Sequence, residues 1–302
     1  MTHFDFIGDI HGHLDKLHKL LGVLGYRAHN GVYTHPERMA FFVGDYIDRG
    51  PNSPGVIRTV RSMVEAGSAI ALMGNHEYNA ICFNTPHPER DFLRPHTIKN
   101  FSQHAATLSQ FHGKQKEYDE AISWFKTLPM WYEHDLFRAV HACWDAPSMD
   151  TLQDSFPDGR LRDDLLGQTA DKSSALYQAV DVSLKGKEAR LPDGYFFLDK
   201  DKHKRRDVRL KWWLDPTGRT FGELSMSEVA EVEKVPVVNV PGLPYSEDER
   251  PVFFGHYWLK GTPDLYRHNV CCLDFSVAKE GHLVAYRFDG EKALDPKKLV
   301  WV

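Results

Sequence analysis

Residues 44–50 read GDYIDRG, so two aspartates and an arginine stand between two glycines within seven residues. Glycine weakens helices and strands, and two of them so close together indicate a backbone that turns sharply or closely approaches another group. Related stretches stand on either side, GDIHG at 8–12 and MGNHE at 73–77. Each of the three follows an apolar run, so they form one pattern.

The apolar runs before these motifs, at 4–7, 39–43 and 69–73, predict three buried strands. Two stretches with apolar residues at helical spacing, 14–24 and 51–66, separate the strands. A strand–helix alternation of this kind is typical of a parallel sheet with right-handed crossovers. Ligands bind at the carboxyl ends of such strands, and all three motifs lie there, so the pattern predicts a site at this edge.

The remainder of the chain is less regular. Residues 85–125 are predicted to form helical or irregular cover over the sheet, and the more polar stretch 146–250 is predicted to be an insertion or cap. We therefore expect a single domain over 1–302, with its core in 1–145 and 251–302. Further strands are expected at 130–133, 136–140, 251–255, 269–275 and 282–288.

Composition narrows the setting. The formal net charge of −5 gives no reason to expect a nucleic-acid or membrane partner, and no apolar run approaches the length of a membrane span. The four cysteines show no CxxC spacing, which is typical of reduced thiols. Because the first motif begins at Gly8, we expect no signal peptide and a cytoplasmic location.

Side chains of metal-ligand type stand after five of the expected strands. Carboxylate oxygen, amide oxygen and imidazole nitrogen are the donors that hard and borderline divalent metal ions prefer. The chain contains 17 histidines, and a single one of them would more often be a core residue than a metal ligand. Six ligand-type residues at successive strand ends, however, predict a site for two metal ions that share a carboxylate. The six are Asp9, His11, Asp45, Asn75, His141 and His256.

GDIHG, GDYIDRG and GNHE, in this order and spacing, resemble the calcineurin-like metallophosphoesterases. The resemblance is to their phosphoprotein phosphatase branch, with its bacterial, phage and dinucleoside-polyphosphatase relatives. It covers 4–80, VHAC at 140–143, FGHYW at 254–258 and the closing strands, but not 146–250. It implies an α/β fold, a two-sheet β-sandwich flanked by helices, with 146–250 as the cap insertion.

The resemblance also divides the six ligands between two metal ions. Asp9 and His11 would bind the first ion, Asp45 would bridge, and the other three would hold the second. Manganese and iron are the ions expected by analogy, with zinc as the alternative. The ions would activate a water molecule for attack on phosphorus.

The resemblance also implies which residues bind the substrate and which residues assist its cleavage. Arg49 would hold phosphate oxygens with its planar fork, and Asn75 would also contact the substrate. His76 would protonate the leaving oxygen, and Asp48 would orient the His76 ring and raise its pKa.

The expected function is therefore hydrolysis of phosphate monoesters in the manner of serine/threonine phosphatases. Departures from eukaryotic protein phosphatases weaken the inference to protein substrates: Leu72-Met73 precedes Gly74, and Tyr257 replaces a threonine. The first alternative is a hydrolase of dinucleoside polyphosphates, such as diadenosine tetraphosphate, or of RNA 5′ ends. A catalytically silent scaffold is least favoured, because the ligand set and the His76–Asp48 pair are complete.

A basic run, KHKRRDVRLKWW at 202–213, bears on this choice. Its alternation places Val208 and Leu210 on one face and Arg209 on the other, which fits an exposed strand with one packed face. The functional interpretation is a basic wall that binds a further phosphate, with Arg209 as the candidate and Arg219 as the weaker one. The partner is then a phosphorylated substrate, phosphoprotein or nucleotide, and nucleic acid is not favoured.

Overall fold

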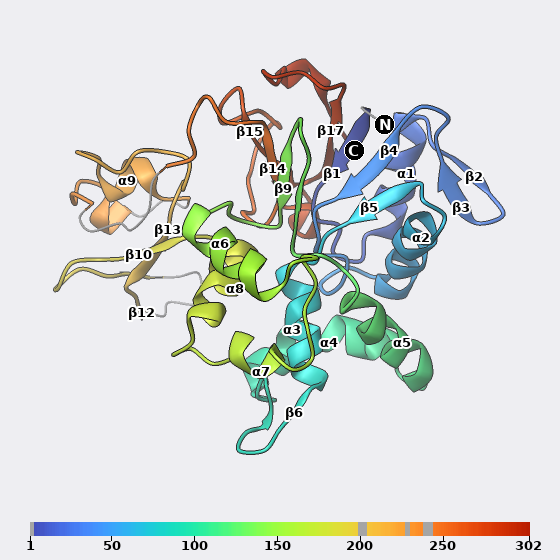
Figure 1. Cartoon of the computed structure of the whole chain (residues 1–302), viewed down its shortest axis with the longest axis horizontal. Coiled ribbons are helices and arrows are strands. Elements are labelled where there is room, and N and C mark those ends of the chain that lie inside the picture. The colour runs from blue at the N-terminus through green and yellow to red at the C-terminus, as the bar shows by residue number, and fades with distance from the viewer. Residues whose placement is uncertain (1–2, 199–203, 227–229, 238–243) are drawn as a thin grey trace.

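Two β-sheets form the centre of the computed structural model, which describes residues 3–198, 204–226, 230–237 and 244–302 (Figure 1). The first sheet has the strand order β16-β17-β1-β4-β5, with β18 paired to β17. Its strands are β1 (Phe4–Ile7), β4 (Met39–Phe42), β5 (Ala69–Ala71), β16 (Asp274–Phe275), β17 (His282–Phe288) and β18 (Leu299–Trp301).

The predicted parallel arrangement is confirmed in the middle of this sheet. β1 and β4 run parallel with Ile7 opposite Phe42, and β4 and β5 run parallel with Phe42 opposite Ala71. All four residues of β1 are buried, because helices cover one face of the sheet and the second sheet covers the other. A strand covered on both faces reads as a continuous apolar run, which is why FDFI was recognisable.

The second sheet has the order β15-β14-β9-β8. The predicted hairpin is confirmed by β8 (Trp131–Glu133) and β9 (Arg138–Val140), which pair antiparallel. β14 (Val252–Phe254) runs parallel to β9 and to β15 (Val270–Cys272).

The prediction of one continuous strand over 269–275 is wrong. The chain leaves the second sheet after β15 and joins the first as β16, with Leu273 between them. The Leu273 N–H still donates to the carbonyl of Phe254 at 2.7 Å, so the crossing keeps its backbone hydrogen bond. An unbroken apolar run does not reveal that its two halves pair with different sheets.

Aromatic rings fill the space between the sheets. Phe6 of the first sheet stacks on Phe253 of the second at 3.7 Å between ring centroids, and Phe137 meets Phe6 edge-on at 4.8 Å. Burial of aromatic surface in such pairs is a large contribution to sheet packing.

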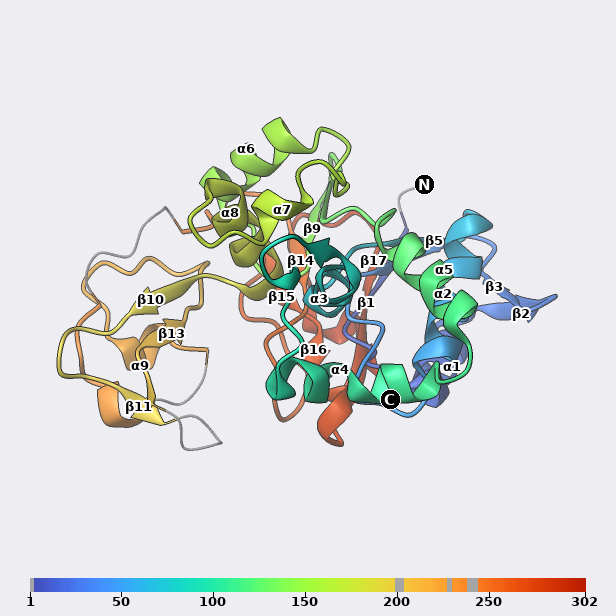
Figure 2. The same ribbon diagram turned by 90° about the horizontal axis from the view of Figure 1, so that it is seen from below.

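Helices cover the outer face of the first sheet (Figures 1 and 2). α1 (Leu14–Leu24) buries its leucines as predicted and ends where Gly25 adopts a φ of 98°. α2 (Ser53–Glu65) begins two residues after the predicted start at residue 51. The Asn52 side chain accepts the Gly55 N–H as an N-cap and so sets the start of the helix. The stretch 85–125, predicted as cover over the sheet, contains α4 (Ile98–Gln110) and α5 (Gln115–Phe125). These helices pack on other helices instead, α4 on α2 and α5 on α3 (Asn75–Asn84).

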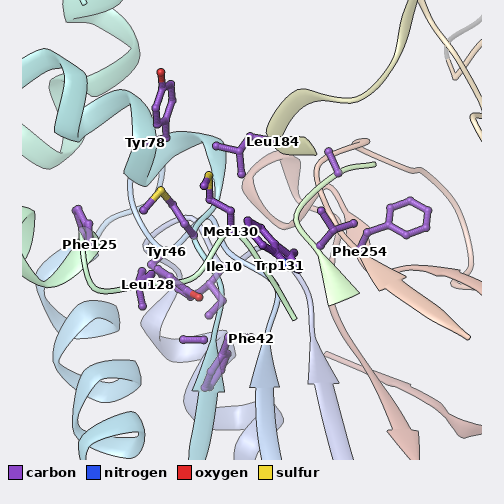
Figure 3. Close-up of a cluster of buried hydrophobic side chains, with 14 of the residues drawn as sticks. Ile10, Phe42, Tyr46, Tyr78, Phe125, Leu128, Met130, Trp131, Leu184 and Phe254 are labelled. Atoms are coloured by element: carbon purple, nitrogen blue, oxygen red, sulfur yellow. The ribbon is translucent and has the colours of Figure 1, made fainter. Parts of the chain in front are cut away.

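At the carboxyl ends of the strands lies a second apolar cluster, in which Ile10, Phe42, Tyr46 and Met130 meet (Figure 3). The four cysteines of the chain are buried free thiols, which fits the reduced state expected of them. In the part of the chain that the structure describes, no helix combines the length and apolar character needed to span a bilayer.

The predicted cap contains two different parts. α6 (Ala146–Ser155) and α8 (Ala175–Lys185) pack into the main core through Met149 and Leu184. Beyond them, β10 (Glu188–Arg190), β13 (Asp207–Arg209) and α9 (Phe221–Leu224) form a lobe with an apolar cluster of its own (Figures 1 and 2). Residues 202–203 of the basic run lie outside the described residues. The remaining short elements are β2 (Arg27–His29), β3 (Val32–Thr34), β6 (Pro86–His87), β7 (Asp91–Phe92), α7 (Leu166–Thr169), β11 (Phe197–Leu198) and β12 (Lys204–Arg205).

Candidate active site and metal centre

The six predicted ligands come together at one edge of the two sheets. All six are buried, with at most 7% of the residue surface exposed. The backbone N–H of His256, after β14, donates to Oδ2 of Asp9, after β1, at 3.0 Å. His141 Nε2, after β9, lies 3.2 Å from Oδ1 of Asn75, the first residue of α3. Residues far apart in sequence therefore share one small volume.

Asp45 occupies the middle of this cluster. Its Oδ1 lies 3.4 Å from His141 Nε2, whereas its Oδ2 lies 3.6 Å from His11 Nε2. The two carboxylate oxygens thus face different histidines, which is the arrangement that a carboxylate shared by two ions requires.

Several buried atoms of the cluster have no hydrogen-bond partner among the residues that the structure describes. They are Asp9 Oδ1, His11 Nε2 and both ring nitrogens of His256. An unpaired buried polar group costs roughly 1–3 kcal/mol, so these atoms are stabilised only if a ligand completes them. Carboxylate oxygen and imidazole nitrogen are donors that divalent transition metals accept, and the residues therefore fit a dinuclear centre.

Two groups of ligand atoms, each within 4.8 Å of one another, share Asp45. One contains His141 and His256, both predicted ligands, and the other contains His11 and His76. His76 Nε2 lies 4.0 Å from Asp45 Oδ2, farther than that of His11, and its Nδ1 is bound to Asp48. We infer that His76 stands beside the metals and that Asp9, with its unpaired oxygen, is the ligand.

Backbone carbonyls orient two of the ligand histidines. His11 Nδ1 donates to the Ile47 carbonyl at 2.9 Å and His141 Nδ1 donates to the Val43 carbonyl at 2.8 Å, so each Nε2 faces the site. Burial, together with the positive field of His76, lowers the pKa of His11 to about 3. Its ring is therefore neutral, the form in which imidazole binds a metal.

Asp48 connects His76 to a second histidine that the sequence analysis missed. His76 Nδ1 donates to Asp48 Oδ2 at 2.5 Å, while His104 Nδ1 and the Thr107 hydroxyl both donate to Asp48 Oδ1 at 2.7 Å. Burial opposes the charge of Asp48, but the hydrogen bonds from His104 and His76 outweigh it and hold the Asp48 pKa well below its usual range. Asp48 is thus fixed as an anion. His104 belongs to α4 and to none of the motifs, so no local signal could have found it.

Burial alone would lower the pKa of His76. The negative charge of Asp45 and the hydrogen bond to Asp48 reverse this effect and raise the His76 pKa above its ordinary value. A raised pKa keeps a proton on the ring near neutrality, as a proton donor needs.

Glu77, the last residue of GNHE, was also missed. Its Oε2 accepts the backbone N–H groups of Asp45 and Gly74 at 2.9 and 3.0 Å, and its Oε1 accepts that of Tyr46 at 2.8 Å. One buried carboxylate therefore holds the loop of the shared aspartate against the start of α3.

Burial raises the pKa of Glu77 to about 7. Replacing Glu77 by glutamine is expected to lower the free energy of unfolding by about 1–3 kcal/mol, because at least one of three buried N–H donors loses its acceptor. Chemical denaturation of the metal-free protein measures the difference. Glu65→Gln is the matched control, since Glu65 is exposed and pairs with Arg61 one helical turn away. A loss no larger than that of the control would contradict this role for Glu77.

Backbone strain is concentrated at the site. Among the described residues, ten non-glycine residues have positive φ, and six of these lie here, which costs roughly 1–2 kcal/mol for each. Two glycines of the motifs stand at positions where no side chain would fit. A Cβ at Gly74 would lie 2.2 Å from Asp45 Oδ1, and one at Gly255 would lie 1.9 Å from Asp9 Oδ1. The six strained residues are His11, Asp45, Asp48, Arg49, His256 and Trp258.

The guanidinium of Arg49 lies over an aromatic ring. Its guanidinium carbon is 3.9 Å from the ring centroid of Trp258, whose other cationic neighbour is Lys279 at the same distance. Stacking of this kind fixes the plane of the guanidinium and therefore the direction of its donors. Trp258 stands two residues after His256 and was not identified from the sequence.

A cavity of about 440 Å³ opens beside Asp45 and is also lined by Arg49 and His76. Arg209 lines it as well, with Val208 and Leu210 buried behind it as their alternation predicted. The weaker candidate, Arg219, donates to the Asp215 carbonyl and does not line the cavity.

A family model described as calcineurin-like phosphoesterase matches residues 2–238 of the chain. Among curated proteins, a bis(5′-nucleosyl)-tetraphosphatase PrpE of Halalkalibacterium halodurans is 50% identical over 74 residues, which is 24% of this chain and 30% of that protein. The PrpE of Bacillus subtilis is 28% identical over 254 residues, which is 82% of this chain and 99% of that protein.

Two solved structures are similar at lower identity. A putative diadenosine tetraphosphatase shares 18% identity with a TM-score of 0.47, and the match covers 100% of this chain and 93% of that one. A serine/threonine phosphatase of Saccharomyces cerevisiae shares 12% identity with a TM-score of 0.49, covering 100% and 79%.

Proposed function

Because the chain belongs to the calcineurin-like phosphoesterase family, we propose that it is a metal-dependent hydrolase whose substrate is a dinucleoside polyphosphate. The cavity beside Asp45 carries this proposal. Its volume of about 440 Å³ is in the range of small-molecule sites, roughly 300–1,000 Å³. Besides Arg49 it is lined by Arg209, which pairs with Glu188 at 3.3 Å through Nη2 but whose buried Nε has no hydrogen-bond partner among the described residues, so this guanidinium can still take a second phosphate oxygen.

A relative that is matched over most of this chain supports the same substrate class. The Bacillus subtilis protein is named a bis(5′-nucleosyl)-tetraphosphatase, and the match extends over 99% of its length. The match to the Halalkalibacterium halodurans protein covers 30% of that protein. The proposed substrate of this chain therefore rests on the residues of its cavity as well as on the similarity to these two proteins.

The ligands proposed for two divalent ions are those of the cluster around Asp45, and Asn75 has its amide oxygen directed at His141. When bound, the ions would stabilise negative charge on the phosphoryl oxygens and lower the pKa of a water molecule. Manganese and iron, or zinc, remain the ions we propose.

Each neighbouring side chain has a proposed role in the cleavage. Arg49, held on Trp258, binds oxygens of the reacting phosphate, and Arg209 binds oxygens of a further phosphate. His76, with Nδ1 fixed by Asp48, presents Nε2 to the leaving oxygen and donates its proton as the phosphorus–oxygen bond breaks. Oxygen from water forms the new bond to phosphorus, so a nucleotide leaves with the proton from His76.

The serine/threonine-phosphatase interpretation is the second candidate. Asp45, Arg49 and His76 would act on a monoester in the same way, because a monoester presents the same reacting phosphate. A monoester supplies no second phosphate for the unpaired Nε of Arg209, and for this reason we place this candidate second.

A panel of substrates tests the proposal on the manganese-supplemented protein. We expect kcat/KM on diadenosine tetraphosphate to exceed that on p-nitrophenyl phosphate, a phosphoserine peptide and capped RNA by about tenfold or more, equivalent to about 1.4 kcal/mol of transition-state binding. Asp45→Asn protein, purified in parallel, controls for contaminating phosphatases. A higher kcat/KM on the phosphoserine peptide or on capped RNA would overturn the choice of substrate.

A further inference from the structure

The cavity continues away from Asp45 along the space between α3 and α4. One face of α3 lines it, with His76, then Asn79 and then Phe83 at helical spacing. From Asn75 to Asn79 the helix rises by about 6 Å, so the cavity reaches well beyond the reacting phosphate. Lys99 and Gln103 of α4 line the opposite part of this extension.

Arg94, in the segment that connects α3 to α4, lines the same extension. Its Nη1 donates to Asn79 Oδ1 at 3.0 Å and its Nη2 donates to Gln103 Oε1 at 2.7 Å. The two amide oxygens fix the guanidinium plane without neutralising its charge. Within the described part of the chain, no carboxylate oxygen lies within 4.0 Å of this guanidinium.

An uncompensated cation in a partly buried position is unusual. Burial lowers the pKa of Arg94 because it removes water from the charged guanidinium, and the weaker fields of Cys82 and Asp48 offset this effect only in part. Arg38 differs from Arg94, because its buried charge is compensated. The Arg38 side chain is 9% exposed and pairs with Asp5 at 2.9 Å. The arrangement of Arg94 is more easily understood if a ligand supplies the missing negative charge.

Lys99 adds a second cation at this end. Its side chain is exposed and forms no ion pair or hydrogen bond with the residues that the structure describes. Two other cations of the cavity differ from it, because Lys185 pairs with Asp181 and Arg209 pairs with Glu188 at 3.3 Å. Arg94 and Lys99 thus have no paired carboxylate among the residues that the structure describes, and both line the extension.

We propose that Arg94 and Lys99 form a subsite for the phosphates of a polyphosphate substrate that do not react. Arginine binds phosphate oxygens through its planar fork, and Asn79 and Gln103 hold that fork in place. The subsite deepens the proposed function and rests on it, since a monoester has no second phosphate to fill it. It also assigns a role to a part of the chain that none of the sequence motifs includes.

The double variant Arg94→Gln/Lys99→Gln tests the subsite against Arg90→Gln/Lys116→Gln. The control removes the same two charges from exposed residues that do not line the cavity. We expect kcat/KM on diadenosine tetraphosphate to fall about ten- to a hundredfold in the test variant, with p-nitrophenyl phosphate hydrolysis within twofold of the control. The inhibition constant of inorganic tripolyphosphate against p-nitrophenyl phosphate should rise by a similar factor.

Three results would overturn the subsite. They are equal losses on both substrates, no loss on either, and a selective loss on a phosphopeptide with acidic flanks, which would assign the cations to a peptide. If the wild-type protein does not cleave diadenosine tetraphosphate, the proposed function fails, but tripolyphosphate inhibition still decides the subsite. Should the double variant fold poorly, Lys99→Gln alone, which removes an exposed side chain, is measured in the same assays.

Discussion

Asp45→Asn is expected to abolish most of the activity and to deprive the protein of its metals. The two carboxylate oxygens of Asp45 face His141 and His11 at 3.4 and 3.6 Å, so one substitution weakens both proposed ion sites. An amide offers one neutral oxygen in place of two that share a negative charge. Loss of several kcal/mol of charge stabilisation corresponds to a fall in kcat of roughly a thousandfold or more.

Metal content is measured on the purified variant by elemental analysis, and folding by circular dichroism and thermal unfolding of the metal-free form. Asp15→Asn, at an exposed position in the first turn of α1, is the matched control and should retain metals and turnover. A full complement of metal with normal turnover in the Asp45 variant would refute the shared-ligand assignment.

His76→Asn should retain its metals but lose catalysis in a way that depends on the leaving group. Because asparagine cannot donate a proton, hydrolysis should slow by the roughly hundred- to ten-thousandfold typical of a lost general acid. The defect should be large for phenyl phosphate, whose leaving oxygen is basic, and small for p-nitrophenyl phosphate. A ratio of the two rates therefore reports the protonation step itself.

This variant also tests whether His76 is a ligand, since its Nε2 lies close enough to His11 and Asp45 to be grouped with them. A fall in metal content would assign His76 to the metal centre and remove it from the role of acid. An equal loss on both substrates would also contradict that role. Exposed His112, replaced in the same way, provides the control.

Most of the first sheet was predictable because its information is local. Strands covered on both faces must be apolar throughout, and the turns that follow them need glycine where a carboxylate closely approaches the backbone. FDFI and MAFFV therefore read as strands, and Gly74 stands beside Asp45 because a Cβ would lie 2.2 Å from its Oδ1. Pairing between distant segments is not local, and the single strand predicted over 269–275 failed for this reason.

The sequence by itself determined the identity of the metal-ligand candidates, because imidazole, carboxylate and amide groups after successive strands already specify the chemistry. Only the tertiary structure decided what surrounds them. His104 reaches Asp48 from α4, 56 residues away, and Trp258 lies under Arg49 because the β14 loop returns to the first sheet. Arg94 has no motif at all. Arg94 became a candidate because no described carboxylate lies close to its guanidinium. Whether a charge is compensated depends on distances in space, which the spacing of residues along the chain does not reveal.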